Sequence, residues 1–108
     1  MNIDLKQFHA VFFEESLEGL DQMESTLLEM EGNPDDEQIN TVFRCAHSIK
    51  GGAGTFGFNH IAEFTHVAET LLDRIRAGSM EINGEIVRLL LESVDVIRTL
   101  ISKSQQDE

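Results

Sequence analysis

A histidine and a lysine stand directly before a cluster of glycines near the middle of this chain. Residues 46–57 read AHSIKGGAGTFG, with His47 in second place, Lys50 three residues later and four glycines within twelve residues. An imidazole with the unperturbed histidine pKa of about 6.5 is mostly neutral near pH 7, so one ring nitrogen has a lone pair that can attack as a nucleophile. The segment is therefore the strongest candidate for chemistry in the sequence.

Three of these glycines lie where the surrounding sequence favours a helix. A glycine in a helix interior weakens the helix by roughly 1 kcal/mol relative to alanine, so Gly51, Gly52 and Gly54 together weaken it by about 3 kcal/mol. On a helix, Lys50, Gly51 and Gly54 fall on the side of His47, at i+3, i+4 and i+7. A surface without side chains beside a basic pair indicates that a partner approaches the backbone there. The ordinary alternative is a solvated histidine near a loosely held helix end.

Other sequence patterns in and near this segment fit their usual functions poorly. Residues 52–57 match the dinucleotide fingerprint G-x-G-x-x-G, but that motif needs a preceding strand, and here a helix precedes it. A P-loop needs its lysine after the glycines, whereas Lys50 comes before them. Residues 63–66 form one Glu-x-x-His unit, but di-iron bundles need two such units, and His66 lies nearly opposite the apolar stripe of its helix. We therefore expect no metal site.

Apolar residues recur at helical spacing in four segments, and no segment reads as a credible strand. The predicted helices span residues 5–31, 36–56, 60–76 and 83–103. The predicted apolar face of the first helix consists of Leu5, Phe8, Phe12, Leu20, Met23, Leu27 and Met30. Gly32 and Pro34 should end that helix, and Asn59 is the expected N-cap of the third. Short connections favour antiparallel neighbours, which predicts an all-α, up-and-down four-helix bundle, with one domain over residues 1–103 and a frayed tail over 104–108.

The composition restricts the class of partner. The chain has 20 acidic against 8 basic residues and a formal net charge of −12. Such a surface repels the phosphates of nucleic acid and anionic lipid headgroups, so a folded protein is the expected partner. The lone cysteine, Cys45, cannot form an internal disulfide, which suits a reducing cytoplasm. No stretch approaches the roughly 20 apolar residues needed to cross a bilayer, and the N-terminus lacks the pattern of a signal peptide.

The histidine segment resembles the phosphorylation segment of the histidine phosphotransfer (HPt) domain found at the N-terminus of CheA-type chemotaxis histidine kinases. The resemblance extends over nearly the whole chain. Residues 1–15 are similar to the family's first helix, Phe43 and Arg44 precede the histidine as in the family, and Ile82 and Asn83 precede a last helix of the expected length. It implies an HPt-like four-helix bundle in which any further C-terminal helix is truncated.

The resemblance also implies a role for each residue of the site. His47 would be the phosphoacceptor, and Lys50, His66 and Glu69 occupy the positions that surround it in the family. Glu69 would accept a hydrogen bond from Nδ1 of His47, which fixes the tautomer and leaves the lone pair on Nε2. Lys50 would stabilise charge on the transferring phosphoryl group. His66 would tune Glu69 and the local charge.

Two protein partners follow from the resemblance, both belonging to a two-component phosphorelay. An ATP-dependent kinase domain of the same parent polypeptide would phosphorylate His47. An aspartate on a response-regulator receiver domain of the CheY or CheB type would then take the phosphoryl group. The bare surface at Gly51, Gly52 and Gly54 is the expected docking site.

The chain contains no ATP-binding domain, so we expect an excised, monomeric domain of a protein-histidine kinase. It would need no cofactor, because ATP and Mg²⁺ would be used by the separate kinase domain, and alone it should hydrolyse no ATP. Two alternatives remain open. One is a phosphate-free helical adaptor bundle that only docks a partner, and the other, less favoured, is a metal-binding helical bundle.

Overall fold

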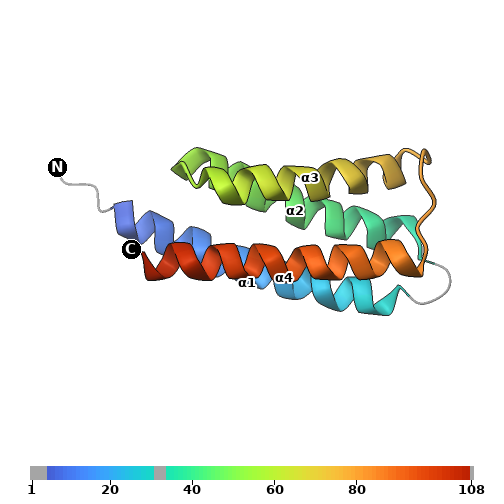
Figure 1. Cartoon of the computed structure of the whole chain (residues 1–108), viewed down its shortest axis with the longest axis horizontal. Helices are drawn as coiled ribbons and strands as arrows, with labels where there is room; N and C mark the ends of the chain where they lie inside the picture. The colour runs from blue at the N-terminus through green and yellow to red at the C-terminus, as the bar shows by residue number, and fades with distance from the viewer. Residues whose placement is uncertain (1–4, 31–33, 108) are drawn as a thin grey trace.

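The computed structural model describes residues 5–30 and 34–107, and these contain four α-helices and no strand. The helices are α1 (Leu5–Glu29), α2 (Asp36–Phe56), α3 (Asn59–Arg76) and α4 (Gly84–Gln106). Each helix contacts the two helices beside it, α1 with α2 and α4, and α3 with α2 and α4. The predicted antiparallel four-helix bundle is thereby confirmed (Figure 1).

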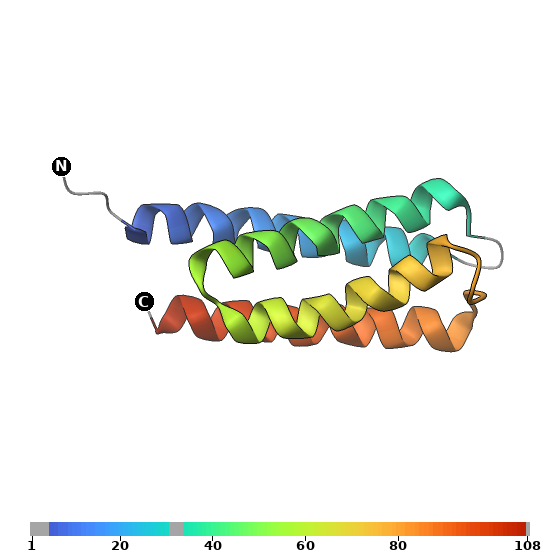
Figure 2. The ribbon, with the colours of Figure 1, turned by 90° about the horizontal axis from the view of Figure 1, so that it is seen from above.

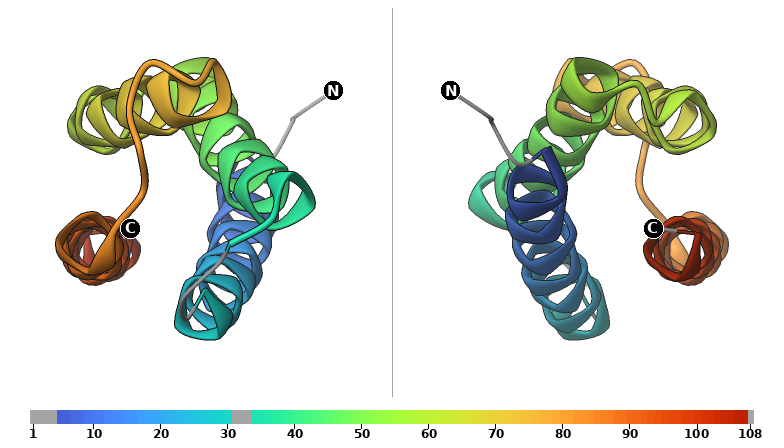
Figure 3. Two further views of the ribbon diagram at one scale, coloured as in Figure 1. Left: turned by 90° about the vertical axis from the view of Figure 1, so that its right-hand side faces the viewer. Right: turned by 90° about the vertical axis from the view of Figure 1, so that its left-hand side faces the viewer.

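The helices run side by side along one long axis and occupy the four corners of the bundle when it is viewed from either end (Figure 3). The turn between α2 and α3 lies at the same end as the start of α1 and the end of α4 (Figure 2). None of the helices in the described ranges is long and apolar enough to cross a membrane.

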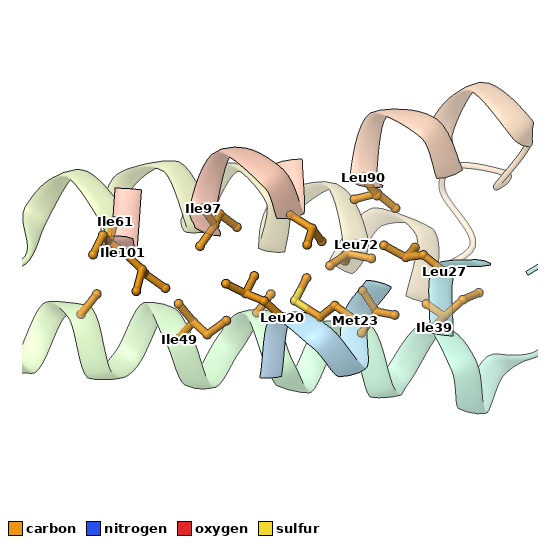
Figure 4. Packing of buried hydrophobic residues seen from close by; sticks show 14 of the residues in the cluster. Leu20, Met23, Leu27, Ile39, Ile49, Ile61, Leu72, Leu90, Ile97 and Ile101 are labelled. Atoms are coloured by element: carbon orange, nitrogen blue, oxygen red, sulfur yellow. The ribbon is translucent and has the colours of Figure 1, made fainter. Parts of the chain in front are cut away.

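Residues from all four helices form one apolar core (Figure 4). Its fully buried members include Leu20 of α1, Val42 of α2, Leu72 of α3 and Ile97 of α4, with exposed fractions of 1% or less. This core fixes α2 against α3, and these are the helices that carry the candidate site residues.

Two residues of the predicted apolar face of α1 are not buried. Leu5 and Phe8 are 61% and 52% exposed. The ribbon of α1 begins beyond the turn between α2 and α3 (Figure 2), and Phe8 lines a surface hollow between α1 and α2.

The start of α2 agrees with its prediction because a capping box forms there. The side chain of Asp35 accepts a hydrogen bond of 2.8 Å from the backbone N–H of Gln38, and the Gln38 side chain accepts one of 3.1 Å from the N–H of Asp35. These bonds satisfy two backbone donors that the first turn of a helix leaves without partners.

The end of α2 is set by Gly57, whose φ of 79° lies in the left-handed region that favours glycine. The N–H groups of Gly57 and Phe58 donate to the carbonyls of Gly54 and Ala53, at 3.3 and 2.9 Å. This pattern closes the helix and turns the chain at once into α3.

The predicted N-cap of α3 is wrong. The cap is Phe58, which makes no side-chain capping hydrogen bond, and Asn59 is already the first helical residue. The Phe58 ring packs at centroid distances of 5.6 and 5.1 Å from Phe12 and Phe13 of α1. The residue at the start of α3 therefore packs on α1 through its ring, where an asparagine cap would have formed a side-chain hydrogen bond.

Two helix ends also differ from their predictions. The first helix ends at Glu29, before the predicted Glu31; Gly32, the expected stop, lies outside the described residues. The last helix begins after Asn83, which caps it through Ile86 N–H at 2.9 Å, and continues to Gln106. Residues 104–106 were expected to lie in the frayed tail, but they contain no glycine or proline that would stop a helix. Fraying of this end in solution stays a prediction.

Candidate functional site

The four predicted site residues come from the two helices that flank the Gly57 turn. His47 and Lys50 lie on α2, three residues apart, and His66 and Glu69 lie on α3, also three residues apart. Residues with this spacing share one face of a helix. Because α2 and α3 are antiparallel and in contact, the structure brings the four side chains together.

Glu69 lies at the centre of the group. Its side chain is only 9% exposed, and its carboxylate oxygens have separate partners. Oε2 lies 2.5 Å from Nδ1 of His47, and Oε1 lies 2.6 Å from Nζ of Lys50. Both distances are shorter than the roughly 2.7–2.9 Å typical of charge-assisted N–H···O hydrogen bonds. One buried carboxylate thus orients the imidazole and the ammonium group at the same time.

His47 combines one nitrogen held by Glu69 with a largely exposed side chain. The His47 side chain is 63% exposed, although Nδ1 is held by Glu69. With the Nδ1 proton donated to a carboxylate, the neutral ring has its lone pair on Nε2. An incoming electrophile would therefore meet an accessible, oriented nitrogen.

Two opposing effects act on the pKa of Glu69. Burial raises the pKa of this carboxyl group, but the hydrogen bonds from Lys50 and His47, with the Lys50 charge, outweigh burial and lower the pKa below its ordinary value. The group is therefore an anion near neutral pH, as its role as an acceptor for two donors requires.

His66 makes the longest contact with Glu69 among the three partners of that carboxylate. Its Nδ1 lies 3.5 Å from Oε1 of Glu69, and its side chain is 63% exposed. At this distance the contact is weaker than the other two and gains charge only when the imidazole is protonated.

Two neighbours of the site were not predicted as site residues. The ring of Phe43 lies nearly parallel to the imidazole of His47, with centroids 5.9 Å apart and planes 13° apart. The guanidinium carbon of Arg76 lies 4.0 Å from the Phe43 ring centroid. The four-residue spacing between Phe43 and His47 is a signal in the sequence, but the contact of Arg76 depends on how α3 packs on α2.

The glycines divide into two classes. A Cβ atom built on Gly51 or Gly54 would have no neighbouring atom within 4 Å, and both positions are exposed. A Cβ atom on Gly52 would lie 2.7 Å from Cδ1 of Phe12. At Gly52 the missing side chain therefore makes room for an aromatic ring of α1, whereas at Gly51 and Gly54 it leaves open space, and the docking role of these glycines stays a prediction.

A surface hollow of about 740 Å³ lies between α1 and α2, and Gly52 is one of the residues that line it. Its apolar lining includes Phe8 and Val11, each 52% exposed, and the buried Ile49. Arg44 and Ser48, which flank His47 along α2, also line it. An apolar hollow this close to an accessible histidine offers a surface for a protein partner.

The remaining motifs have no structural support as ligand sites. Residues 52–57 form the end of α2 and its cap, where a dinucleotide fingerprint would need a strand and then a helix. Among residues 5–30 and 34–107, no group of three or more His, Cys, Asp or Glu side chains is arranged to hold a metal ion.

Comparison with known proteins gives consistent matches. The model of the Hpt domain family matches residues 7–105. The chain is 45% identical to "Chemotaxis protein CheA" of Salmonella typhimurium, covering 100% of this chain and 16% of that protein. It is 40% identical to "Chemotaxis protein CheA" of Rhizobium meliloti, covering 95% of this chain and 14% of that protein. The chain thus spans less than a fifth of the length of these relatives.

Solved structures match over most of the bundle. The CheA phosphotransferase domain from Thermotoga maritima superposes with a TM-score of 0.83 at 38% identity, covering 90% of this chain and 93% of that one. The phosphorylated P1 domain of CheA3, solved in complex with CheY6 from R. sphaeroides, superposes with a TM-score of 0.87 at 25% identity, covering 94% of this chain and 80% of that one.

Proposed function

This chain belongs to the Hpt domain family, and from that premise we propose that it is the phosphorelay carrier of a two-component chemotaxis system. His47 receives a phosphoryl group from the ATP-dependent kinase domain of its parent histidine kinase and passes it to an aspartate on a response-regulator receiver domain of the CheY or CheB type. The observation that carries the proposal is the 2.5 Å contact between Nδ1 of an exposed histidine and a buried carboxylate. That contact leaves Nε2 as an accessible nucleophile.

The first transfer uses the lone pair on Nε2 of His47. Nε2 attacks the γ-phosphorus of ATP, an N–P bond forms, and the P–O bond to ADP breaks with its electron pair leaving on ADP. The ring keeps its Nδ1 proton and becomes cationic, and the carboxylate of Glu69 stabilises that charge. In the second transfer the receiver carboxylate attacks phosphorus, and the N–P electron pair returns to Nε2.

Glu69 and Lys50 have separate electrostatic roles. Glu69 fixes the imidazole tautomer, and the contact with Lys50 keeps that carboxylate ionised, as its lowered pKa indicates. Nζ of Lys50 is 2.6 Å from Glu69, and an ammonium group has three donors in all. The remaining donors are available to an oxygen of a phosphoryl group bound to Nε2. His66 modulates the charge on Glu69 from a longer distance.

The docking role is assigned to Gly51 and Gly54. Both lie on the exposed side of α2 with open space where a side chain would be. A kinase or receiver loop can therefore approach the backbone within the reach of His47. Gly52 belongs to the packing of α2 against α1.

The partners and setting follow from the same premise. Phosphoryl transfer asks chiefly for positioning and charge stabilisation, so the domain needs no cofactor of its own. The net charge of −12 disfavours nucleic acid and anionic membranes as partners. We place the domain in the cytoplasm as a monomeric unit of a larger kinase.

A transfer assay tests the proposal. The domain is incubated with radiolabelled ATP and the cognate kinase domain, and acid-labile phosphate is measured before and after a receiver domain is added. We expect labelling of the wild-type chain, loss of label to the receiver, and no labelling of His47→Gln with unchanged helicity. His60→Gln, at an exposed histidine on α3, is the matched control and should be labelled normally. A wild-type chain that binds the kinase domain and takes no phosphate would favour the adaptor alternative.

A further inference from the structure

We propose that Phe43 is a positioning residue for phosphoryl transfer at His47, and that Arg76 holds Phe43 in place. The inference rests on the proposed role of His47 as phosphoacceptor. Phe43 does not touch the phosphoryl group in this account. It acts through the plane of the His47 ring.

The geometry of the two rings supports this role. Phe43 precedes His47 by four residues on α2, so the side chains are neighbours on one helix face. The ring planes are 13° apart and the centroids 5.9 Å apart, which is an offset parallel arrangement. Phe43 is partly buried and packs against the core, whereas the His47 side chain is 63% exposed. The anchored ring therefore restrains the exposed one.

Glu69 alone does not define the direction of attack. Its single hydrogen bond fixes Nδ1 of His47, but the imidazole can still tilt about the line of that bond. The lone pair on Nε2 lies in the ring plane, so a tilt turns it away from the phosphorus atom. Misplacement of a reacting atom by about 1 Å can slow a reaction on the order of a hundredfold. A parallel ring beside the imidazole resists this tilt.

Arg76 connects Phe43 to the helix that carries Glu69. The guanidinium carbon lies 4.0 Å from the Phe43 ring centroid, which is a cation–π contact. The guanidinium is itself 3.9 Å from Oδ1 of Asp73, one turn earlier on α3. Both restraints on His47 therefore come from α3, directly through Glu69 and indirectly through Arg76 and Phe43.

Kinetics of the Phe43 variants test the proposal. Phe43→Leu removes the ring, Phe43→Tyr restores it, and Phe64→Leu is the matched control at another partly buried phenylalanine. With the kinase domain as enzyme and each variant as substrate, Phe43→Leu should lower kcat about three- to tenfold with KM unchanged. Phe43→Tyr should restore kcat. Equal losses in Phe43→Leu and Phe64→Leu, or no rescue by tyrosine, would overturn the proposal.

NMR provides a readout that does not depend on phosphorylation. The Phe43 ring current should displace the ring-proton shifts of His47 in the wild type and in Phe43→Tyr, and the displacement should vanish in Phe43→Leu. Arg76→Gln, which leaves the core intact, should reduce that displacement and lower kcat by about twofold. If Phe43→Leu does not fold, unchanged shifts and kcat in Arg76→Gln would refute the inference. A wild-type domain that takes no phosphate would instead refute the proposed function, whatever the ring shifts.

Discussion

Glu69 is the residue on which the geometry of the site depends. It is buried, yet it binds a solvent-exposed imidazole and a partly exposed ammonium group with its two oxygens. Burying a carboxylate is unfavourable unless charged or hydrogen-bonded partners compensate. His47 and Lys50 supply that compensation, so removal of any one of the three side chains disturbs the other two.

The first prediction at this scale concerns the rate of phosphorylation. Glu69→Ala should leave His47 able to accept phosphate but slow the reaction by on the order of 10²-fold or less, because the tautomer is no longer fixed. The rate of label incorporation from the kinase domain measures this. Glu63→Ala, at an exposed carboxylate on the same helix, is the control and should react at the wild-type rate. A wild-type rate for Glu69→Ala would reduce Glu69 to a structural charge.

The second prediction concerns the pH dependence of stability. The pKa of Glu69 is lowered in the folded protein from a reference of 4.5. A lowered folded pKa gives stability that is present above the unfolded pKa and is lost as the pH falls through the folded value. Wild type should therefore exceed Glu69→Gln in free energy of unfolding by on the order of 2 kcal/mol at pH 7.

Urea unfolding at a series of pH values checks this. The difference between wild type and Glu69→Gln should shrink as the pH falls below about 4.5. A difference that stays constant from pH 7 to pH 3 would show that the charge of Glu69 contributes nothing to folding.

At the scale of the elements, α2 combines a buried face with an exposed face on which two glycines lie beside His47 and Lys50. Glycines lie on both faces of this helix. Gly52 makes room for the Phe12 ring, while Gly51 and Gly54 have open space where a side chain would be. Phe12 is 7% exposed and lies in contact with Phe13, Phe56 and Phe58. The ring therefore has little room to move away from a new methyl group.

Alanine substitutions at adjacent glycines should then have opposite effects. Gly51→Ala should raise the free energy of unfolding by up to about 1 kcal/mol, because alanine favours the helix and meets no neighbour. Gly52→Ala should lower it by about 1–3 kcal/mol through overpacking against Phe12. Thermal and urea unfolding measure both, with wild type as reference. Changes of the same sign would contradict the division of the glycines into two classes.

The helices themselves were predictable from sequence, since apolar periodicity and the Gly57 stop mark α2 and α3 clearly. The pairing of His47 with Glu69 followed from the family resemblance. The contacts that were missed depend on packing across helices. Phe12 against Gly52, and Arg76 over Phe43, join residues far apart in the chain, so helical spacing within one segment does not reveal them.

At the scale of the whole molecule, the bundle places the site across α2 and α3 and leaves one side of α2 accessible. Ion pairs also join α1 and α4, the two helices that do not carry the candidate site residues. Arg98 of α4 binds Asp21 and Glu24 of α1 at 3.0 and 3.3 Å. The bare backbone beside His47 should decide how closely the proposed partners approach this surface.

A large side chain on that surface tests the approach of partners. Gly51→Leu should slow transfer from phosphorylated His47 to a receiver domain by about tenfold or more, because the side chain occupies the docking surface. The melting temperature should stay the same or rise, since leucine favours a helix over glycine. Stopped-flow or gel-based transfer assays measure the rate. Normal transfer by Gly51→Leu would rule out close docking over this glycine.

The central claim is that Nε2 of His47 accepts the phosphoryl group while Nδ1 keeps its proton on Glu69. The most direct test is long-range ¹H–¹⁵N NMR of the domain with ¹⁵N-labelled histidine, before and after phosphorylation by the kinase domain, with both ring nitrogens of all four histidines assigned. We predict a phosphorus coupling on Nε2 of His47 alone and a protonated Nδ1 in the same ring. A phosphoryl group on Nδ1 of His47, or on any other histidine, would contradict the account.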